Sequence, residues 1–168
     1  KIESISLLGL YNRRDAYLVA CSLHKTLNIP MDRLLNVLSN FPGLSRRFRK
    51  IADNLYSDYA HTPEKITGAM SVAKESLLPD QNLVIVYEPL TNRRMHYMKH
   101  LHKDIFEGAG KIYWVPSYLA REDPNQHILK PEHLINELSP SLQKLAEPAE
   151  LDINLKANID KHLSQKDL

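Results

Sequence analysis

The sequence predicts an α/β domain with a mostly parallel β-sheet, preceded by a pair of helices. Two short apolar runs, at residues 83–87 and 112–115, are rich in β-branched and aromatic residues, which is typical of strands covered on both faces. A segment with helical spacing of apolar residues lies between them. Strand, helix and strand in this order indicate a βαβ unit with parallel strands and a right-handed crossover.

The two helices before this unit are predicted from spacing and from the residues that stop them. Apolar residues recur at near-helical intervals over residues 12–27, and Pro30 follows. A second helix is expected over residues 31–41, before the dipeptide Pro42-Gly43, which is the candidate domain boundary. The chain therefore divides into a helical segment, residues 1–42, and an α/β segment, residues 43–168.

The elements of the second segment follow from local signals. Two short strands are expected at residues 48–51 and 54–59, and a helix begins at Thr62 with Pro63 at its first helical position. The helix of the βαβ unit is expected over residues 92–107, with an apolar side made of Met95, Met98, Leu101 and Ile105. Residues 117–130 are expected to be irregular, and 131–138 and 153–163 helical. Because a helix in a doubly wound sheet leads into another strand, we expect the sheet to continue beyond residue 168.

The composition excludes several classes of protein. The chain has 168 residues, 43% of them hydrophobic and 25% charged, which predicts a globular protein. No apolar run approaches the roughly 18–20 residues that cross a bilayer, and no signal peptide opens the sequence, so we expect a cytoplasmic protein without a membrane partner. The single cysteine, Cys21, is expected in the core. A formal net charge of +2 does not indicate a nucleic-acid partner for the whole molecule.

A basic run at residues 46–50 (RRFRK) is the densest positive charge in the chain. Taken alone, it favours a solvated turn or strand edge. The alternative is an RNA-binding surface, for which Phe48, Tyr56 and Tyr59 could stack on bases. Phe48 alternates with charges as a core-facing strand residue does. His96 and His100 are four residues apart, but a solvated helix face is favoured over a metal pair, so no metal site is predicted.

Residues 58–63 (DYAHTP) join a predicted strand to the start of a predicted helix. Ligands gather at such places in α/β sheets, because the first amides of the helix are unpaired and its dipole favours anions. Asp58 could accept hydrogen bonds from ribose hydroxyls, while His61 and Thr62 could face a phosphate or carboxylate. The other interpretation is that Asp58 and Thr62 are helix or turn caps.

Three strings, in this order and at about these spacings, resemble the Mur ligases of bacterial cell-wall synthesis. They are residues 9–16 (GLYNRRDA), 41–48 (FPGLSRRF) and 58–63 (DYAHTP). The first departs from the family pattern, with Tyr11 in place of a histidine and Asp15 in place of a second asparagine. The resemblance implies a three-domain enzyme with a UDP-sugar domain, a central P-loop domain and a Rossmann-like C-terminal domain. Residues 1–42 would be the tail of the central ATPase domain, and residues 43–168 the C-terminal domain, truncated before its last strand.

The resemblance also implies ligands and the residues that contact them. ATP and Mg²⁺ would be the cofactors, with the metal held mainly by parts of the enzyme outside these 168 residues. No P-loop string occurs in the sequence, so this chain alone is not expected to be active, and no catalytic residue is assigned. The ATP-binding residues would be Asn12 and Asp15 near the adenine, Arg46 and Arg47 at the phosphates, and Asp58 at the ribose; the second-substrate or phosphate side would hold His61, Thr62, Asn92 and Arg94.

Two strings bear on which family member the chain resembles. Residues 87–94 (YEPLTNRR) share Glu88, Pro89 and Asn92 with ligases that reattach recycled peptides, whereas residues 115–122 (VPSYLARE) resemble those that add L-alanine. The implied activity is joining of an amino acid, with L-alanine favoured, to UDP-N-acetylmuramate through an acyl phosphate. The alternatives are a recycled peptide as acceptor, another amino-acid-adding ligase, or a non-catalytic nucleotide- or RNA-binding α/β module. The remaining partner would be the rest of the same enzyme.

Overall fold

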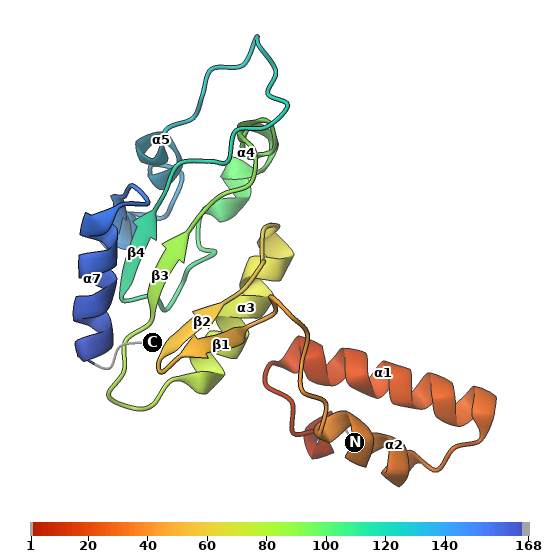
Figure 1. The fold of residues 1–168 in the computed structure, drawn as a ribbon. Helices are drawn as coiled ribbons and strands as arrows, with labels where there is room; N and C mark the ends of the chain where they lie inside the picture. The colour runs from red at the N-terminus through yellow and green to blue at the C-terminus, as the bar shows by residue number, and fades with distance from the viewer. Residues whose placement is uncertain (1, 166–168) are drawn as a thin grey trace.

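The computed structural model describes residues 2–165 and shows a helical pair beside an α/β unit (Figure 1). After a 3₁₀ turn at Ile2–Ser4, helices α1 (Leu10–Leu27) and α2 (Met31–Ser39) pack against each other. Asn28 ends α1 in the left-handed conformation, with φ of 52°, which is a common helix stop. Both helices predicted before residue 42 are therefore confirmed. In the described part of the chain, no helix is both long and apolar enough to span a bilayer.

A β-hairpin and a long helix follow. Strands β1 (Arg49–Ala52) and β2 (Leu55–Ser57) are antiparallel and joined by a two-residue turn, in which Asn54 has φ of 55°. Helix α3 (Pro63–Ser76) then begins at its proline, as predicted. The hairpin is a separate two-stranded sheet and is not hydrogen-bonded to the main sheet.

The main sheet has three parallel strands in the order β3 (Val84–Tyr87), β4 (Lys111–Trp114) and β5 (Ala146–Pro148). Ile85 lies opposite Ile112, and Tyr87 opposite Trp114. This arrangement confirms the α/β class and the parallel sheet. Strand β5 was not predicted, because its three residues contain a glutamate and a proline and form no apolar run.

Helices cover the two faces of this sheet unequally. Helices α3, α4 (Asn92–Met98), α5 (Pro131–Ile135) and α6 (Pro140–Gln143) contribute to the large core on one face, which includes Ile66, Met95, Trp114, Leu134 and Leu142. Helix α7 (Ile153–Ser164) packs through Leu155 against Tyr113 and Val115 on the other face. Trp114 is fully buried and Met95 nearly so, which confirms their predicted core positions.

The main correction concerns the helix predicted over residues 92–107, which is shorter than expected. Helix α4 ends at Met98 and continues as a 3₁₀ segment, Lys99–His102, and then as turns. Because a 3₁₀ segment has about 3.0 residues per turn instead of 3.6, the buried face shifts along the sequence. Leu101 is consequently 51% exposed, whereas His102 and Phe106 are buried in its place.

Two predictions of burial are also wrong in part. Strand β3 was expected to be covered on both faces, but it is an edge strand in the described part of the sheet, and Val86 is 41% exposed. In α1, Ala16 and Ala20 are buried, but Leu27 is 63% exposed and Cys21 is only half-buried. The buried positions of α1 are thus alanines, whereas the larger side chains of Leu18, Val19 and Leu27 are exposed.

Candidate nucleotide and substrate site

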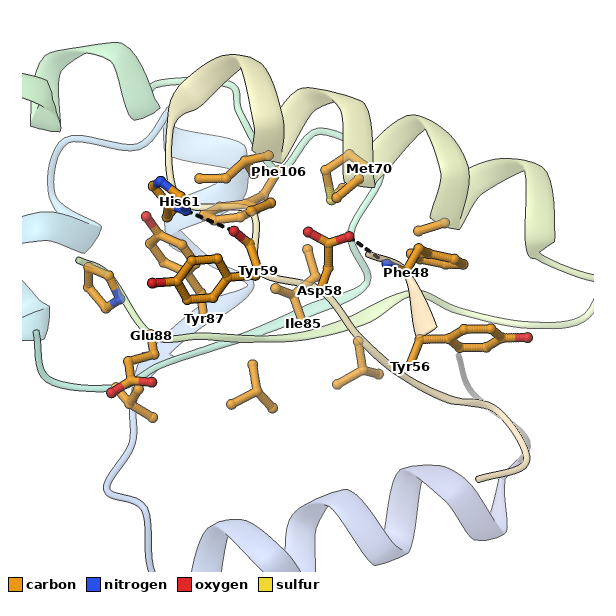
Figure 2. Close-up of a pocket in the computed structure, with 18 of the residues that line it drawn as sticks. Phe48, Tyr56, Asp58, Tyr59, His61, Met70, Ile85, Tyr87, Glu88 and Phe106 are labelled. Atoms are coloured by element: carbon orange, nitrogen blue, oxygen red, sulfur yellow. Dashed lines mark hydrogen bonds between the residues drawn. The ribbon is translucent and has the colours of Figure 1, made fainter. Parts of the chain in front are cut away.

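A groove lies between the β1–β2 hairpin, α3 and strand β3 (Figure 2). Its volume is about 560 Å³, and most of its lining is apolar. The polar side chains that line it include Asp58, His61 and Glu88, and Figure 2 shows His61 and Glu88 on the side where β3 ends. Ligands in α/β proteins bind outside the carboxyl ends of the strands, so the part of the groove beside His61 and Glu88 is the part placed for a ligand. The structure therefore brings Asp58 and His61 to one groove.

Three hydrogen bonds join the basic run to the segment that follows β2. The amide of Tyr59 donates to the Arg46 carbonyl at 3.0 Å, and the amide of Phe48 donates to Asp58 Oδ2 at 2.6 Å. The Arg47 guanidinium donates to the Tyr59 carbonyl at 3.4 Å. We call this set of bonds the 46–59 clasp. It means that two of the three strings that resemble the Mur ligases form one local structure.

The backbone within the 46–59 clasp is strained. Arg46 has φ of 58° and Phe48 has φ of 42°, in the left-handed region that residues other than glycine seldom occupy. The Phe48 ring stacks on Tyr56, with centroids 4.7 Å apart. The Asp58 bond to the Phe48 amide helps to hold this conformation, so Asp58 has a structural role, and its contact with ribose stays a prediction.

His61 is oriented by its own segment. Its Nδ1 lies 2.8 Å from the Tyr59 carbonyl, and because a carbonyl only accepts, Nδ1 carries a proton. In the neutral ring, Nε2 is then the atom able to accept a proton or hydrogen bond from a ligand. The ring also packs edge-on against Tyr59, with centroids 5.0 Å apart.

Thr62 occupies the N-cap position of α3, but its side chain makes no capping bond to the helix amides. It hydrogen-bonds Glu64 instead. The backbone amide of Glu64 and then the Thr62 hydroxyl lower the pKa of the Glu64 carboxyl. Thr62 is therefore the N-cap residue, as predicted, although its hydroxyl does not cap the helix amides, and its place at the second-substrate side stays a prediction.

Asn12 and Asp15 are exposed on α1 and do not line the groove. The Asn12 amide donates to the Leu8 carbonyl at 2.7 Å, one turn earlier. Arg46 and Arg47 are exposed beside the hairpin and also lie outside the groove lining. Their predicted contacts with ATP are untested by the geometry.

Asn92 is fully buried at the start of α4. Its Nδ2 donates to the His127 carbonyl at 3.1 Å, and its Oδ1 accepts from the Leu129 amide at 2.7 Å. Both ends of the side chain are thus engaged with the irregular segment 117–130. In this structure the residue anchors that segment, so its predicted contact with the second substrate would require a rearrangement.

Glu122 anchors the same segment from the other side. Its carboxylate accepts hydrogen bonds from the Arg93 amide at 3.0 Å and from the Ala120 amide at 2.9 Å. A negative charge at the first turn of α4 is favourable. Glu122 lies in the string 115–122, but the sequence analysis assigned it no role, because its partner Arg93 lies far away in the sequence. Arg94, next along α4, is exposed.

The other expectations concern metals and aromatic lining. Among residues 2–165, no group of three or more His, Cys, Asp or Glu side chains is placed to hold a metal ion. His96 is engaged with the His127 carbonyl at 2.9 Å. Tyr87 and Tyr118 line the groove and were not predicted as site residues, although both fall in the strings 87–94 and 115–122. Burial raises the pKa of the Tyr87 hydroxyl above its usual range.

The chain is similar to known ligases over most of its length. It is 30% identical over 131 residues to a UDP-N-acetylmuramate–L-alanine ligase of Rickettsia felis, and 31% identical over 121 residues to that of Salinibacter ruber. These alignments cover 73% and 69% of this chain but only 26% and 25% of the relatives. The chain thus spans about a quarter of their length. No protein-family model matches it.

A solved structure supports the same relationship at the level of the fold. The crystal structure of the UDP-N-acetylmuramate–alanine ligase of Thermotoga maritima matches with a TM-score of 0.61 and 23% identity, over 87% of this chain and 30% of that one. The α/β fold, the strings joined in the 46–59 clasp and these similarities show that the chain carries a Mur ligase domain. Within that family, the domain is like that of the UDP-N-acetylmuramate–L-alanine ligases.

Proposed function

We propose that the chain is the C-terminal part of an ATP-dependent ligase that joins L-alanine to UDP-N-acetylmuramate in peptidoglycan synthesis. The identity of 30% over 131 residues to an enzyme of that name carries the proposal. ATP would phosphorylate the muramate carboxylate, and the alanine amine would attack the acyl phosphate and release phosphate. Mg²⁺ would neutralise charge on the transferring phosphoryl group. Since the 168 residues contain no P-loop string, catalysis would need the other domains.

The domain division is part of the same proposal. Residues 1–42 would be the tail of the central ATPase domain, and residues 43–168 most of the C-terminal domain. Helix α2 ends at Ser39, and Gly43 adopts φ of 84° before the hairpin begins, which supports a junction at Pro42-Gly43. The α1–α2 pair also lies to one side of the main sheet (Figure 1).

We further propose that a strand follows α7 in the C-terminal domain, and the sheet topology indicates where it would lie. The connections from β3 to β4 and from β4 to β5 pass over one face, whereas α7 lies on the opposite face. Right-handed crossovers on opposite faces move in opposite directions along a sheet. A strand after α7 would therefore lie beside the open edge of β3, between β3 and the hairpin. It would fill the apolar part of the groove and leave the polar end of the groove for substrate.

The proposed site roles follow the family resemblance and the polar end of the groove. Arg46 and Arg47 are exposed and able to bind phosphate oxygens through their guanidinium forks. His61 would contact the second substrate through Nε2. The remaining proposed contacts are Asn12 and Asp15 with the adenine, Asp58 with the ribose, and Thr62, Asn92 and Arg94 on the second-substrate side.

An ATP-consumption assay on the complete protein tests the proposal. The assay would contain UDP-N-acetylmuramate and Mg²⁺ and would compare L-alanine with a short peptide as acceptor. Turnover that depends on L-alanine is expected. Turnover that depends on the peptide would move the assignment to a recycling ligase, which Glu88, Pro89 and Asn92 favour, and no turnover with either would refute a muramate ligase.

A pair of arginine variants tests the phosphate contact. Arg46→Gln should raise the KM for ATP, because it removes a cation proposed to touch the phosphates. Arg49→Gln, on the exposed strand β1, is the matched control and should leave KM unchanged. Equal effects of both variants would indicate a general loss of positive charge rather than a specific contact.

A further inference from the structure

Helix α3 has two packed faces. One face packs into the core of the main sheet through Ile66, Met70 and Ala73. The other meets the start of α1 through Gly68, Val72 and Glu75. The spacing within each set is three or four residues, as expected for one side of a helix. Helix α3 therefore joins the helical segment to the α/β segment.

The Glu75 carboxylate gathers three hydrogen bonds from the start of α1. The Gly9 amide donates to Oε2 at 3.0 Å, and the Arg13 guanidinium donates to Oε2 at 2.9 Å and to Oε1 at 3.0 Å. Arg13 also donates to the Leu7 carbonyl at 3.0 Å, which fixes the guanidinium. A bidentate pair of this kind is among the stronger side-chain interactions. Arg13 and then the Gly9 amide hold the pKa of the Glu75 carboxyl below its usual range.

The apolar part of the same contact is close-fitting. Gly9 has φ of 84°, and a Cβ at this position would lie 2.4 Å from Val72 Cγ2, which only glycine avoids. One turn earlier on α3, the Tyr11 ring lies 3.8 Å from where a Cβ of Gly68 would stand. The contact thus combines steric fit with a charged pair whose side chains are 23% and 33% exposed. Being near the surface, the pair can be broken without unfolding the core.

We propose that Glu75 is an interdomain latch: by binding the Gly9 amide and the Arg13 guanidinium, it holds residues 1–42 in one orientation against the α/β segment. The latch rests on the proposed domain division and not on the ligase activity. It acts on the string 9–16, to which the family resemblance assigns the adenine. The orientation of the two segments and the geometry of that string are therefore coupled.

Distance measurement between spin labels tests the latch without nucleotide. Labels would be placed at two exposed positions, Arg33→Cys on α2 and Asn158→Cys on α7, in a Cys21→Ser background of the 168-residue chain. The unaltered latch should give one narrow distance distribution. Glu75→Gln should shift or broaden it. Glu64→Gln removes the same charge from the other end of α3, and as the matched control it should leave the distribution narrow.

Hydrogen exchange gives a second readout and guards against a folding failure. In Glu75→Gln, amides at 9–13 should exchange roughly tenfold faster, as expected for loss of a charge-assisted pair, while those of β3 and β4 stay protected. Arg13→Gln should have a similar effect, and the double variant should add little to either single one. Unchanged distances and exchange in both single variants would overturn the latch. Such a result would leave the proposed ligase function untouched, because no nucleotide or substrate is present.

Discussion

Replacing Asn92 by alanine should destabilise the α/β segment through one identifiable loss. The buried amide of Asn92 is the partner of both the His127 carbonyl and the Leu129 amide. Leu129 is 3% exposed, so its amide cannot readily turn to water when its acceptor is removed. His127 is exposed, so its carbonyl can be hydrated again at lower cost.

The expected magnitude follows from these two environments. A buried donor left without a partner costs about 1–3 kcal/mol, and the void left by the amide adds to it. We therefore expect the free energy of unfolding to fall by about 2–4 kcal/mol. Urea denaturation followed by the fluorescence of Trp114, the only tryptophan and fully buried, measures this. With a slope of about 2 kcal/mol per molar urea, the midpoint should fall by about 1–2 M.

Asn158→Ala on the exposed side of α7 is the matched control and should change stability by no more than about 0.5 kcal/mol. A change for Asn92→Ala as small as that of the control would refute the reasoning. It would show that segment 117–130 is not anchored through Asn92. Asn92 would then be free to contact the second substrate, as the family resemblance implies.

Three further perturbations test other parts of the structure. Burial lowers the pKa of His102, so below about pH 7 the unfolded chain binds a proton that the folded chain does not. The free energy of unfolding should therefore fall as pH drops, by at most about 1.4 kcal/mol per pH unit. In urea titrations at several pH values, His102→Gln should remove this part of the pH dependence. Gly9→Ala should lower the free energy of unfolding by more than about 1 kcal/mol in the same assay. Adding Val72→Ala should remove the clash between the new Cβ and Val72, but the destabilisation that comes from the positive φ of residue 9 should remain. Hydrogen bonds from the Leu155 and Asn154 amides lower the pKa of Asp152, so its ionised side chain caps α7 at neutral pH, and this stabilisation is lost as pH falls through the lowered pKa. Asp152→Ala should therefore lower the thermal midpoint at pH 7, and the difference from the unaltered protein should shrink as pH falls below the ordinary pKa of aspartate.

The parts of the fold that the sequence predicted are those with local signals. Proline at the start of α3 and asparagine at the end of α1 act through the backbone of one or two residues, so these helix ends can be predicted without the tertiary structure. Strand β4 could be predicted because both of its faces are covered, which gives it a continuous apolar run. Strand β5 could not be predicted, because its backbone hydrogen bonds to β4, rather than its own side chains, define it as a strand.

The site was predictable in the same uneven way. Asp58 and His61 reach one groove because a hairpin and a helix start position them locally. Asn92 was assigned to a ligand, but its partners are 35 and 37 residues further along the chain, and no pattern in the sequence indicates that pairing. Glu122 was missed for the same reason, as its contact with the Arg93 amide spans 29 residues.

The 46–59 clasp changes how substitutions in the family strings should be interpreted. Asp58 binds the Phe48 amide, and Arg46 and Phe48 are held in a strained backbone conformation by that contact and its neighbours. Removing the Asp58 carboxylate would therefore break the hydrogen bond that holds the residues before the hairpin, as well as any contact with ribose. Arg46→Gln keeps its carbonyl, and with it the bond from the Tyr59 amide. A loss of ATP affinity can thus be attributed to the guanidinium in Arg46→Gln, but in Asp58→Ala only if exchange at the Phe48 amide is unchanged.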